Sequence, residues 1–305
     1  MTSSHHHRMI PLMLKLRRGV CAAMIAASLS MSAAPAEAAA SSLSSLSSFS
    51  DLSSFGSSMV GSGSHTVYVG GQNRLYTLVL PRNYNPARAY PVILGFGGWQ
   101  HDAARARSYE QLERAAGDRA IVIYPQGVAN AWGGAPYAKT SMQSDIRYIR
   151  AVLDKVGVFH KIDRKRIYAA GLSNGGGMAA ALSCHAPDLV AGIASVAGAY
   201  YNPTVSNCAP GKVATLIMHA DNDNTVSYSG GVRHGAPYRS VPSVFNDFGR
   251  RNACNMNKVG THQAGNTTVS VPAGCAARTE LRRIAGGGHT WFPGTTDQVV
   301  RFFLG

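Results

Sequence analysis

One serine stands in a setting that could make it a nucleophile. Ser173 is the centre of a Gly-x-Ser-x-Gly pentapeptide, which follows an apolar stretch of strand length and precedes small residues suited to a helix. A serine hydroxyl attacks a carbonyl carbon only with a base in reach and N–H groups facing the developing oxyanion. A tight strand-to-helix turn exposes the hydroxyl, and the flanking Gly171 and Gly175 leave room beside it. The pentapeptide alone is weak evidence in a glycine-rich chain, but this strand and helix around it predict a nucleophile elbow.

A histidine near the end of the chain could accept the serine proton. His289 follows three glycines at 286–288, and such a loop can bring an imidazole onto a serine, whereas a core histidine would have apolar neighbours. The order serine, aspartate, histidine is that of the α/β-hydrolases, so we predict that His289 is the base. The other histidines are scattered without metal-ligand spacing, and the chain has no phosphate-binding loop. The sequence therefore predicts no metal and no cofactor.

Two aspartates compete for the third role in such a triad. Asp221 and Asp223 follow an apolar strand predicted at 213–219. Residues after the strands of a parallel sheet meet at its carboxyl edge, where substrates bind, so either carboxylate could orient the imidazole of His289. The aspartate that is not used would cap a turn. The residues alone leave both assignments open.

A second glycine-rich turn could complete an oxyanion site. The strand predicted at 90–96 runs into Gly97-Gly98-Trp99, and such an exit carries the second oxyanion donor in hydrolases of this kind. That donor would be the backbone N–H of Trp99 or Gly98, with an ordinary turn as the alternative. The first donor would be the N–H of Asn174, directly after the serine. Trp99 and Trp291 flank the site in sequence, and we assign substrate binding to Trp291, with a packed core tryptophan as the alternative.

Alternating strands and helices would hold these residues in place. After an antiparallel hairpin of 66–69 and 75–80, the pattern predicts strands at 90–96, 120–124, 189–199 and 213–219, and helices at 103–116 and 144–156. Such alternation is typical of a parallel sheet with helices on both faces. The predicted fold class is therefore α/β, an α/β-hydrolase fold with a mostly parallel central sheet and an N-terminal antiparallel hairpin. Asp145, near the start of the second helix, suits the helix dipole and is interpreted as structural.

Residues 1–38 have the composition of a secretory signal peptide. Four basic residues precede an apolar stretch at 19–34, and Ala36-Glu37-Ala38 offers a cleavage site after Ala38. A membrane span is the competing interpretation, but this stretch is too short to cross about 30 Å of hydrocarbon. We therefore expect a secreted, extracellular protein without a transmembrane span.

Residues 39–64 are rich in serine and are predicted to be a flexible linker. They cannot bury enough apolar surface to offset the entropy of an ordered chain. Leu43, Leu46 and Phe49 recur every third residue and would suit a short amphipathic helix, but serine fills most other positions. The remaining residues, 65–305, suit one α/β catalytic domain.

Four cysteines remain after the signal peptide, which suits two disulfides in an exported chain. Three pairings are possible, and local spacing favours Cys184 with Cys208 and Cys254 with Cys275. The formal net charge is +14, and the signal peptide's four basic and one acidic residues account for +3, leaving about +11. We exclude nucleic acid as the partner of a secreted chain, and we expect a monomer that associates with an anionic cell wall.

Three motifs together resemble the secreted poly(3-hydroxybutyrate) depolymerase and feruloyl esterase-like family of α/β-hydrolases. They are the segments 171–178, 219–231 and 286–291, and Tyr124-Pro125-Gln126-Gly127 fits as well. The resemblance runs from about residue 66 to the C-terminus. It indicates the family rather than one substrate.

The resemblance assigns the triad. It implies that Ser173 is the nucleophile, His289 the base and Asp223 the acid, because Asp223 keeps the family's distance to Tyr228. Two departures bear on the site. Gly97-Gly98 stands where the family has His-Gly at the oxyanion strand, and an aspartate stands at 221 where the family has threonine, which keeps Asp221 as a rival acid.

The implied function is that of a serine esterase without a cofactor. The serine would form an acyl-enzyme with the acid part of an ester, and water would then release that acid. The ester could be polymeric, as in a hydroxyalkanoate polyester, or a feruloyl or acetyl ester of a polysaccharide. Two other functions stay open: an acyltransferase acting on cell-envelope alcohols, and a non-catalytic wall-binding protein on a hydrolase scaffold.

Overall fold

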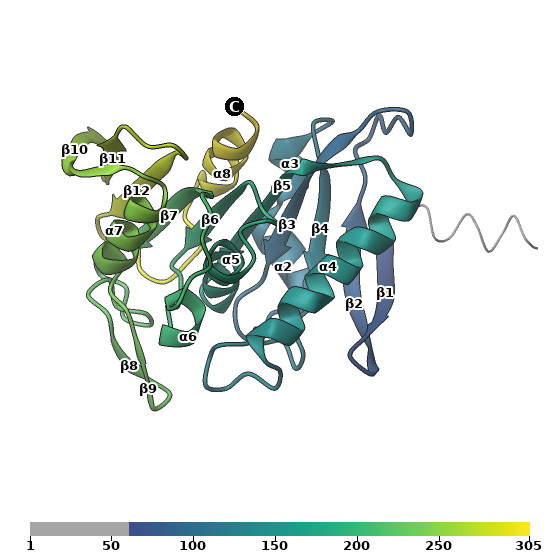
Figure 1. The fold of residues 1–305 in the computed structure, drawn as a ribbon, viewed down its shortest axis with the longest axis horizontal. Coiled ribbons are helices and arrows are strands. Elements are labelled where there is room, and N and C mark those ends of the chain that lie inside the picture. The colour runs from purple at the N-terminus through teal and green to yellow at the C-terminus, as the bar shows by residue number, and fades with distance from the viewer. Residues whose placement is uncertain (1–60) are drawn as a thin grey trace, which may run out of the picture. The chain divides into compact units, whose positions relative to one another are not determined.

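A mixed sheet of ten strands forms the centre of the fold in the computed structural model, which describes residues 61–305 (Figure 1). The signal peptide and most of the linker predicted above lie outside this range. The strand order is β1-β2-β4-β3-β5-β6-β7-β12-β11-β10. The six central strands of this order, from β4 through β3, β5, β6 and β7 to β12, run parallel to one another. The outer pairs are antiparallel: β1–β2 and β2–β4 at one edge, and β12–β11 and β11–β10 at the other. Their bounds are Gly63–Val69 (β1), Gln72–Val79 (β2), Tyr90–Phe96 (β3), Ile121–Pro125 (β4), Ile162–Leu172 (β5), Gly192–Val196 (β6), Ala214–Ala220 (β7), Asn255–Ala264 (β10), Thr267–Ala273 (β11) and Thr279–Ile284 (β12).

The predicted N-terminal hairpin is confirmed as β1 and β2. Gly70 and Gly71 make its turn with φ angles of +61° and +83°, which glycine adopts without strain. The first strand begins at Gly63 rather than at His65, the predicted start of the folded domain. The boundary moves because Gly63 and Ser64 pair with residues of β2, opposite Leu78 and Thr77.

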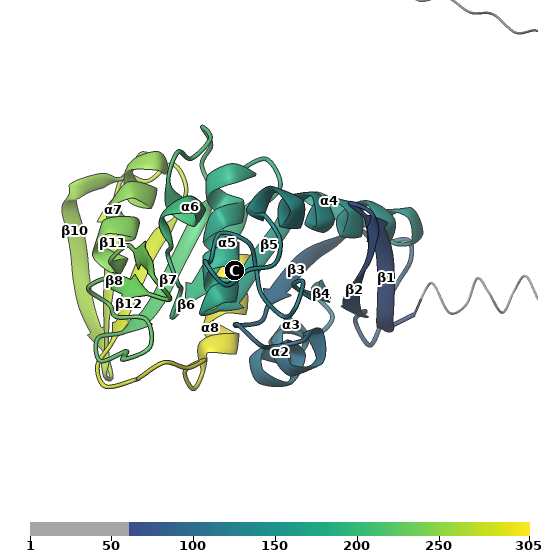
Figure 2. The ribbon, with the colours of Figure 1, turned by 90° about the horizontal axis from the view of Figure 1, so that it is seen from below.

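Helices cover both faces of the sheet, as the alternating pattern predicts (Figure 2). One face packs against α2 (Ala103–Glu110), α3 (Leu112–Ala116) and α8 (Thr295–Leu304). The other packs against α4 (Met142–Phe159), α5 (Asn174–His185) and α7 (Val241–Arg251), while α6 (Asn202–Val205) is a single turn. Alternation along β3 serves both layers, because Val92 and Leu94 enter one core and Ile93 the other.

Two parts of the fold differ from the expected pattern. The helix predicted at 103–116 is divided into α2 and α3, because Gln111 takes a left-handed conformation with φ of +47°. After α7, β10 and β11 extend the sheet. Before α7, β8 (Gly231–Arg233) and β9 (Ala236–Tyr238) form a separate hairpin. Most residues of β10 are exposed, so no apolar alternation in the sequence marks that strand.

Two disulfides connect segments of the second half of the chain. Cys184 near the end of α5 is bonded to Cys208, and Cys254 before β10 is bonded to Cys275 after β11. These are the two pairs that local spacing favours. Among residues 61–305, no helix combines the length and the apolar character needed to cross a membrane.

Candidate active site

Ser173 lies on the sharp turn between β5 and α5. Its backbone has φ of +57° and ψ of −117°, a conformation that a residue with a side chain keeps only when its surroundings enforce it. A Cβ atom on Gly175 would lie 1.9 Å from the carbonyl oxygen of Phe96, and one on Gly171 would lie 2.5 Å from the backbone of Gly175. Both glycines are therefore required by close packing of the turn against the end of β3, and the serine is presented at the carboxyl edge of the sheet.

Asp223 and His289 are joined by a short hydrogen bond. Nδ1 of His289 lies 2.7 Å from Oδ2 of Asp223, and because a carboxylate only accepts, the imidazole donates and its Nε2 is left to act as a base. The other oxygen of Asp223 accepts the backbone N–H groups of Thr225 and Val226, both at 2.8 Å. A second imidazole contributes, since Nε2 of His219 is 3.2 Å from Oδ2. Four N–H groups thus converge on one buried carboxylate.

These donors decide the charge of Asp223. Burial by itself raises the pKa of this carboxyl group, but the hydrogen bonds from His219, His289 and the Val226 amide outweigh it and hold the pKa well below its ordinary value. Asp223 is therefore ionised at neutral pH, as a carboxylate must be to stabilise an imidazolium beside it.

Asp221, the rival acid, contacts a different part of the same loop. Its Oδ1 accepts the N–H of Gly286 at 3.1 Å, and its Oδ2 is 3.2 Å from the guanidinium of Arg283. Between the two aspartates, Oδ1 of Asn222 accepts the N–H of Gly288 at 2.8 Å. Asp221 and Asn222 therefore fasten the glycine loop that carries His289, while Asp223 meets the imidazole itself.

Ser173 and His289 are both present at the edge of the sheet, but they are not bonded to each other. Within residues 61–305, Oγ of Ser173 makes no hydrogen bond to the imidazole. Catalytic hydrogen bonds commonly tighten only when substrate is bound. The structure thus joins the aspartate and the histidine directly and places the serine on its own strained turn.

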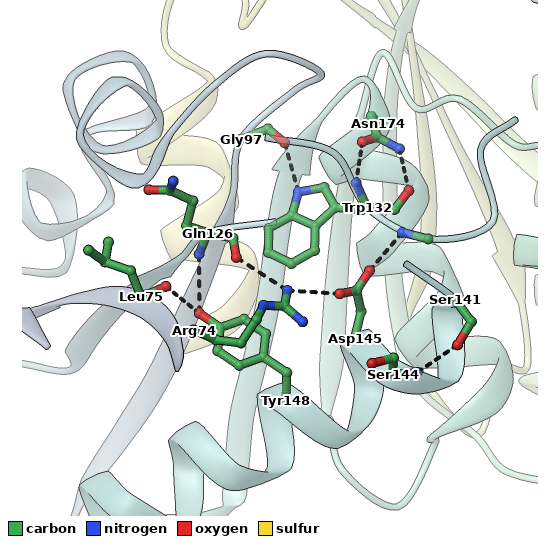
Figure 3. A network of polar contacts seen from close by, with 11 residues as sticks. Arg74, Leu75, Gly97, Gln126, Trp132, Ser141, Ser144, Asp145, Tyr148 and Asn174 are labelled. Carbon is green, nitrogen blue, oxygen red and sulfur yellow. Dashed lines mark hydrogen bonds and ion pairs between the residues drawn. The ribbon is translucent and has the colours of Figure 1, made fainter. Parts of the chain in front are cut away.

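The two predicted oxyanion segments are tied together by Trp132 (Figure 3). The side-chain amide of Asn174 pairs with the backbone of Trp132, accepting its N–H at 2.7 Å and donating to its carbonyl at 3.2 Å. The indole Nε1–H of Trp132 donates to the carbonyl of Gly97 at 3.0 Å. The N–H of Asn174 is at the first turn of α5, where the helix supplies no partner for it. Because a Cβ on Gly98 would lie 3.5 Å from Cβ of Ser173, the segment before Trp99 also lies against the serine.

A buried ion pair supports the loop that carries Trp132. Oδ1 of Asp145 is 2.8 Å from Arg74, and its Oδ2 accepts the N–H of Gly133, next to Trp132, at 2.7 Å (Figure 3). Burial raises the pKa of Asp145, although the Gly133 N–H and Arg74 act in the opposite direction. The carboxylate predicted to be structural thus links the N-terminal hairpin and α4 to the loop behind the oxyanion segments.

The two tryptophans flanking the site have different surroundings. Trp291 is buried, and its indole N–H donates to Thr296 at 3.0 Å within the core beneath α8. This placement corresponds to the packed-core alternative rather than to an open substrate surface. Trp99 is 37% exposed, stacks on Tyr137 with ring centres 4.4 Å apart, and meets the edge of His234 at 5.1 Å. Residues of three separate loops thus form an aromatic cluster, Trp99–Tyr137–His234, next to the elbow.

Three residues of the site were not singled out by sequence reasoning. Asn222 and His219 stand within four positions of Asp223 and belong to the family-like segment 219–231, and these are the two signals that could have drawn attention to them. Trp132 had no such signal, because its partners Asn174 and Gly97 lie far away along the chain. In the described part of the chain, no group of three or more histidine, cysteine, aspartate or glutamate side chains is arranged to hold a metal ion.

The fold is that of the α/β-hydrolases, and the curated relatives of the chain are named as esterases. NocK of Nocardia uniformis subsp. tsuyamanensis, named as an esterase, is 27% identical over 255 residues, which cover 75% of this chain and 74% of NocK. Feruloyl esterase C of Emericella nidulans is 26% identical over 222 residues, covering 69% and 75% of the two chains. Feruloyl esterase B of Piromyces equi is 26% identical over 239 residues, which are 73% of this chain but only 44% of that protein.

Solved structures agree with this fold. An acetyl xylan esterase from Aspergillus awamori superposes with a TM-score of 0.61 at 13% identity, covering 79% of this chain and 99% of the other. A thermophilic esterase, Est2 of Thermogutta terrifontis, gives 0.52 at 17% identity, covering 81% and 90%. No protein-family model matches the chain. The curated relatives confirm the predicted resemblance to feruloyl esterase-like α/β-hydrolases, and the solved structures confirm the fold.

Proposed function

We propose that this protein is a secreted serine esterase in which Ser173, His289 and Asp223 act as nucleophile, base and acid. The observation that carries the proposal is the 2.7 Å contact between Nδ1 of His289 and the buried, ionised Asp223, at the sheet edge that also presents Ser173 on a strained turn. The relatives named as esterases support the same class of reaction.

The proposed reaction proceeds through an acyl-enzyme. Nε2 of His289 accepts the hydroxyl proton of Ser173 as Oγ attacks the ester carbonyl carbon, and the imidazolium is stabilised by Asp223. The N–H of Asn174, with that of Trp99 or Gly98, donates to the oxyanion. The alcohol leaves with the proton from His289. Water then repeats the sequence on the acyl-enzyme, which releases the acid and restores the serine.

The proposed substrates are feruloyl or acetyl esters of a polysaccharide, with a hydroxyalkanoate polyester as the second choice. Two of the relatives described above are named as feruloyl esterases. The Trp99–Tyr137–His234 cluster beside the elbow offers flat rings on which an aromatic acyl group can stack. Secretion is supported by the predicted signal peptide and by the two disulfides, which persist in oxidising compartments.

The test is hydrolysis of a short p-nitrophenyl ester, methyl ferulate, an acetylated xylan and a polyester film by the wild-type protein and Ser173→Ala. We expect wild-type turnover and a loss on the order of 10³-fold or more in the variant, with an unchanged melting temperature. Near wild-type activity in Ser173→Ala would overturn the assignment of the nucleophile. A higher kcat/KM on methyl ferulate than on acetyl esters is expected if the aromatic cluster binds the acyl group.

The same assays separate the two other functions. An acyltransferase would divert product from free acid to a new ester when an alcohol acceptor is added. A wall-binding protein would bind an anionic polysaccharide and hydrolyse none of the esters, in the wild type as well as in Ser173→Ala. The positive formal charge of the chain is the observation behind that last possibility.

A further inference from the structure

His219 is a fully buried histidine whose polar contacts lead to the candidate acid. It lies near the end of β7, and its Nε2 is 2.8 Å from the carbonyl oxygen of Val226 and 3.2 Å from Oδ2 of Asp223. A carbonyl only accepts, so Nε2 carries a proton. That proton is shared between the Val226 carbonyl and the carboxylate in a three-centre arrangement.

The other ring nitrogen of His219 has no partner. Among residues 61–305, Nδ1 makes no hydrogen bond although it is buried. A buried polar atom without a partner lowers stability, and a plain apolar residue would avoid this cost at the centre of a core. The useful contacts of the ring are therefore all on its Nε2 side, toward Asp223 and the turn that follows it.

Oδ2 of Asp223 is shared by two imidazoles. It accepts Nδ1–H of His289 from one side and contacts Nε2–H of His219 from the other, while Oδ1 is held by two backbone N–H groups. A carboxylate held by four donors cannot rotate without losing several of them. It also has less negative charge to offer to any one of them.

From this geometry, and resting on the triad proposed above, we propose that His219 is a positioning residue for ester hydrolysis. It fixes the orientation of the Asp223 carboxylate toward His289 and limits how strongly that carboxylate holds the His289 proton. It touches neither the substrate nor the reacting atoms and acts only through Asp223.

The other groups packed around the His219 ring are an aromatic ring and an arginine that is paired elsewhere. Tyr228 meets the ring edge-on at 6.0 Å between centres, and Arg283 of β12, the register partner of His219, lies over the same tyrosine. Arg283 is paired with Asp221 at 3.2 Å. Asp223 is thus the ionised group that His219 contacts directly.

The experiment compares His219→Leu, which removes the donor, with His219→Gln, whose amide N–H can take the place of Nε2–H. We expect His219→Leu to lower kcat about tenfold to a hundredfold with little change in KM. Without the second donor, Asp223 holds the His289 proton more tightly, so the acidic limb of kcat/KM moves to higher pH. His219→Gln is expected to recover most of kcat and to return the limb toward its wild-type position.

His160 supplies the matched control. It is also buried, has one polar contact, to Tyr84 at 2.9 Å, and has an unpartnered Nε2 within the described range, but it lies at the end of α4, before β5. His160→Leu should lower the melting temperature and leave the pH profile of the folded protein unchanged. Any effect of His219→Leu shared with this control is then one of stability.

Three results would overturn the inference. The first is a wild-type kcat and a wild-type pH profile in folded His219→Leu. The second is an equal loss of kcat in His219→Leu and His219→Gln, with the acidic limb of kcat/KM unmoved in both. The third is a shift of that limb in the control His160→Leu. If His219→Leu does not fold, the proton resonance between His289 and Asp223 is compared in the wild type and His219→Phe, which keeps an aromatic ring but has no donor, and an unchanged resonance contradicts the proposal. Failure of the triad itself is distinguishable, because Ser173→Ala would then remain active whatever the His219 variants do.

Discussion

Asp221 and Asp223 lie two positions apart, yet their carboxylates meet different groups. Asp223 accepts the imidazole N–H, whereas Asp221 accepts the Gly286 N–H and faces Arg283. We expect Asp223→Asn to lower kcat by about 10³- to 10⁴-fold, because an amide favours the wrong tautomer of His289 and cannot stabilise its charged form. Asp221→Asn keeps an acceptor for Gly286 and loses only a partly exposed ion pair, so its cost should stay below about tenfold.

The measurement is kcat on a short ester for both purified amide variants, with melting temperatures determined alongside. Matched melting temperatures show that a loss of activity is not a loss of folded protein. An inactive Asp221→Asn beside an active Asp223→Asn would mean that His289 takes its partner from Asp221.

Single residues differed in how far the sequence could define their roles. Ser173 could be singled out because a strained turn demands glycines at fixed positions, and His289 because glycines precede it. The residues alone left Asp221 and Asp223 open, because tertiary packing decides which carboxylate is buried and faces the imidazole. Only the family-like distance to Tyr228 favoured Asp223. The contact of His219 with Asp223 was not foreseen for the same reason.

Trp132 connects two elements that are far apart in the chain, the start of α5 and the end of β3. Its backbone pairs with the side chain of Asn174, and its indole N–H donates to Gly97. We expect Trp132→Phe to keep the edge-on packing against Phe96, whose ring centre is 5.0 Å away, but to release the Gly97 carbonyl. The oxyanion donors should then be less well fixed, lowering kcat by about tenfold with little change in KM.

Tyr148→Phe is the control for this variant. It removes a phenol that donates to the carbonyl of Leu75 in the same network and leaves the indole bond intact (Figure 3). A lower melting temperature with unchanged kcat is expected. Equal kcat values for wild type and Trp132→Phe on several esters would show that the tie to Gly97 does not matter for the reaction.

At the scale of elements, the sequence was informative where local chemistry sets the structure. β3 has the predicted bounds, and α4 runs from Met142 to Phe159 around the helix predicted at 144–156. The break at Gln111 was not predicted, because that residue type does not demand a left-handed conformation. β10 was also missed, since its pairing with β11 rather than an apolar face holds it in place.

Two glutamates are buried in the described domain, one paired with arginines and the other without a hydrogen-bond partner for its carboxyl group. Glu280 faces Arg278 and Arg282 at 2.8 and 2.6 Å. Glu110, at the end of α2, is fully buried, and neither of its carboxyl oxygens has a hydrogen-bond partner among residues 61–305. Its carboxyl group lies against β3, where a Cβ on Gly95 would be 2.7 Å from Oε2. Such differences arise from long-range packing of the sheet and its helices, and the sequence pattern gave no sign of them.

Glu110 should make the stability of the domain depend on pH. Burial first, and the nearby Glu113 second, raise the pKa of Glu110 well above its ordinary value of 4.5. At a pH above the ordinary value of 4.5, Glu110 loses its proton in the unfolded chain but keeps it in the folded protein. The folded state then binds more protons, so the stability of the domain falls as the pH rises toward the folded-state pKa of Glu110. Glutamine carries no titrating proton, so Glu110→Gln should remove this loss.

The expected result is that the melting temperature of Glu110→Gln, relative to wild type, increases between about pH 5 and about pH 8, by roughly 2–4 °C for each kcal/mol gained in a domain of this size. Taking the difference between two proteins cancels the other carboxyl groups, including Asp223, whose lowered pKa acts at more acidic pH. Glu280→Gln is the matched control and should lower the melting temperature at neutral pH, because it leaves two arginines without their buried partner. A Glu110→Gln difference that stays constant with pH, or that grows toward acidic pH, would show that Glu110 is ionised in the folded protein.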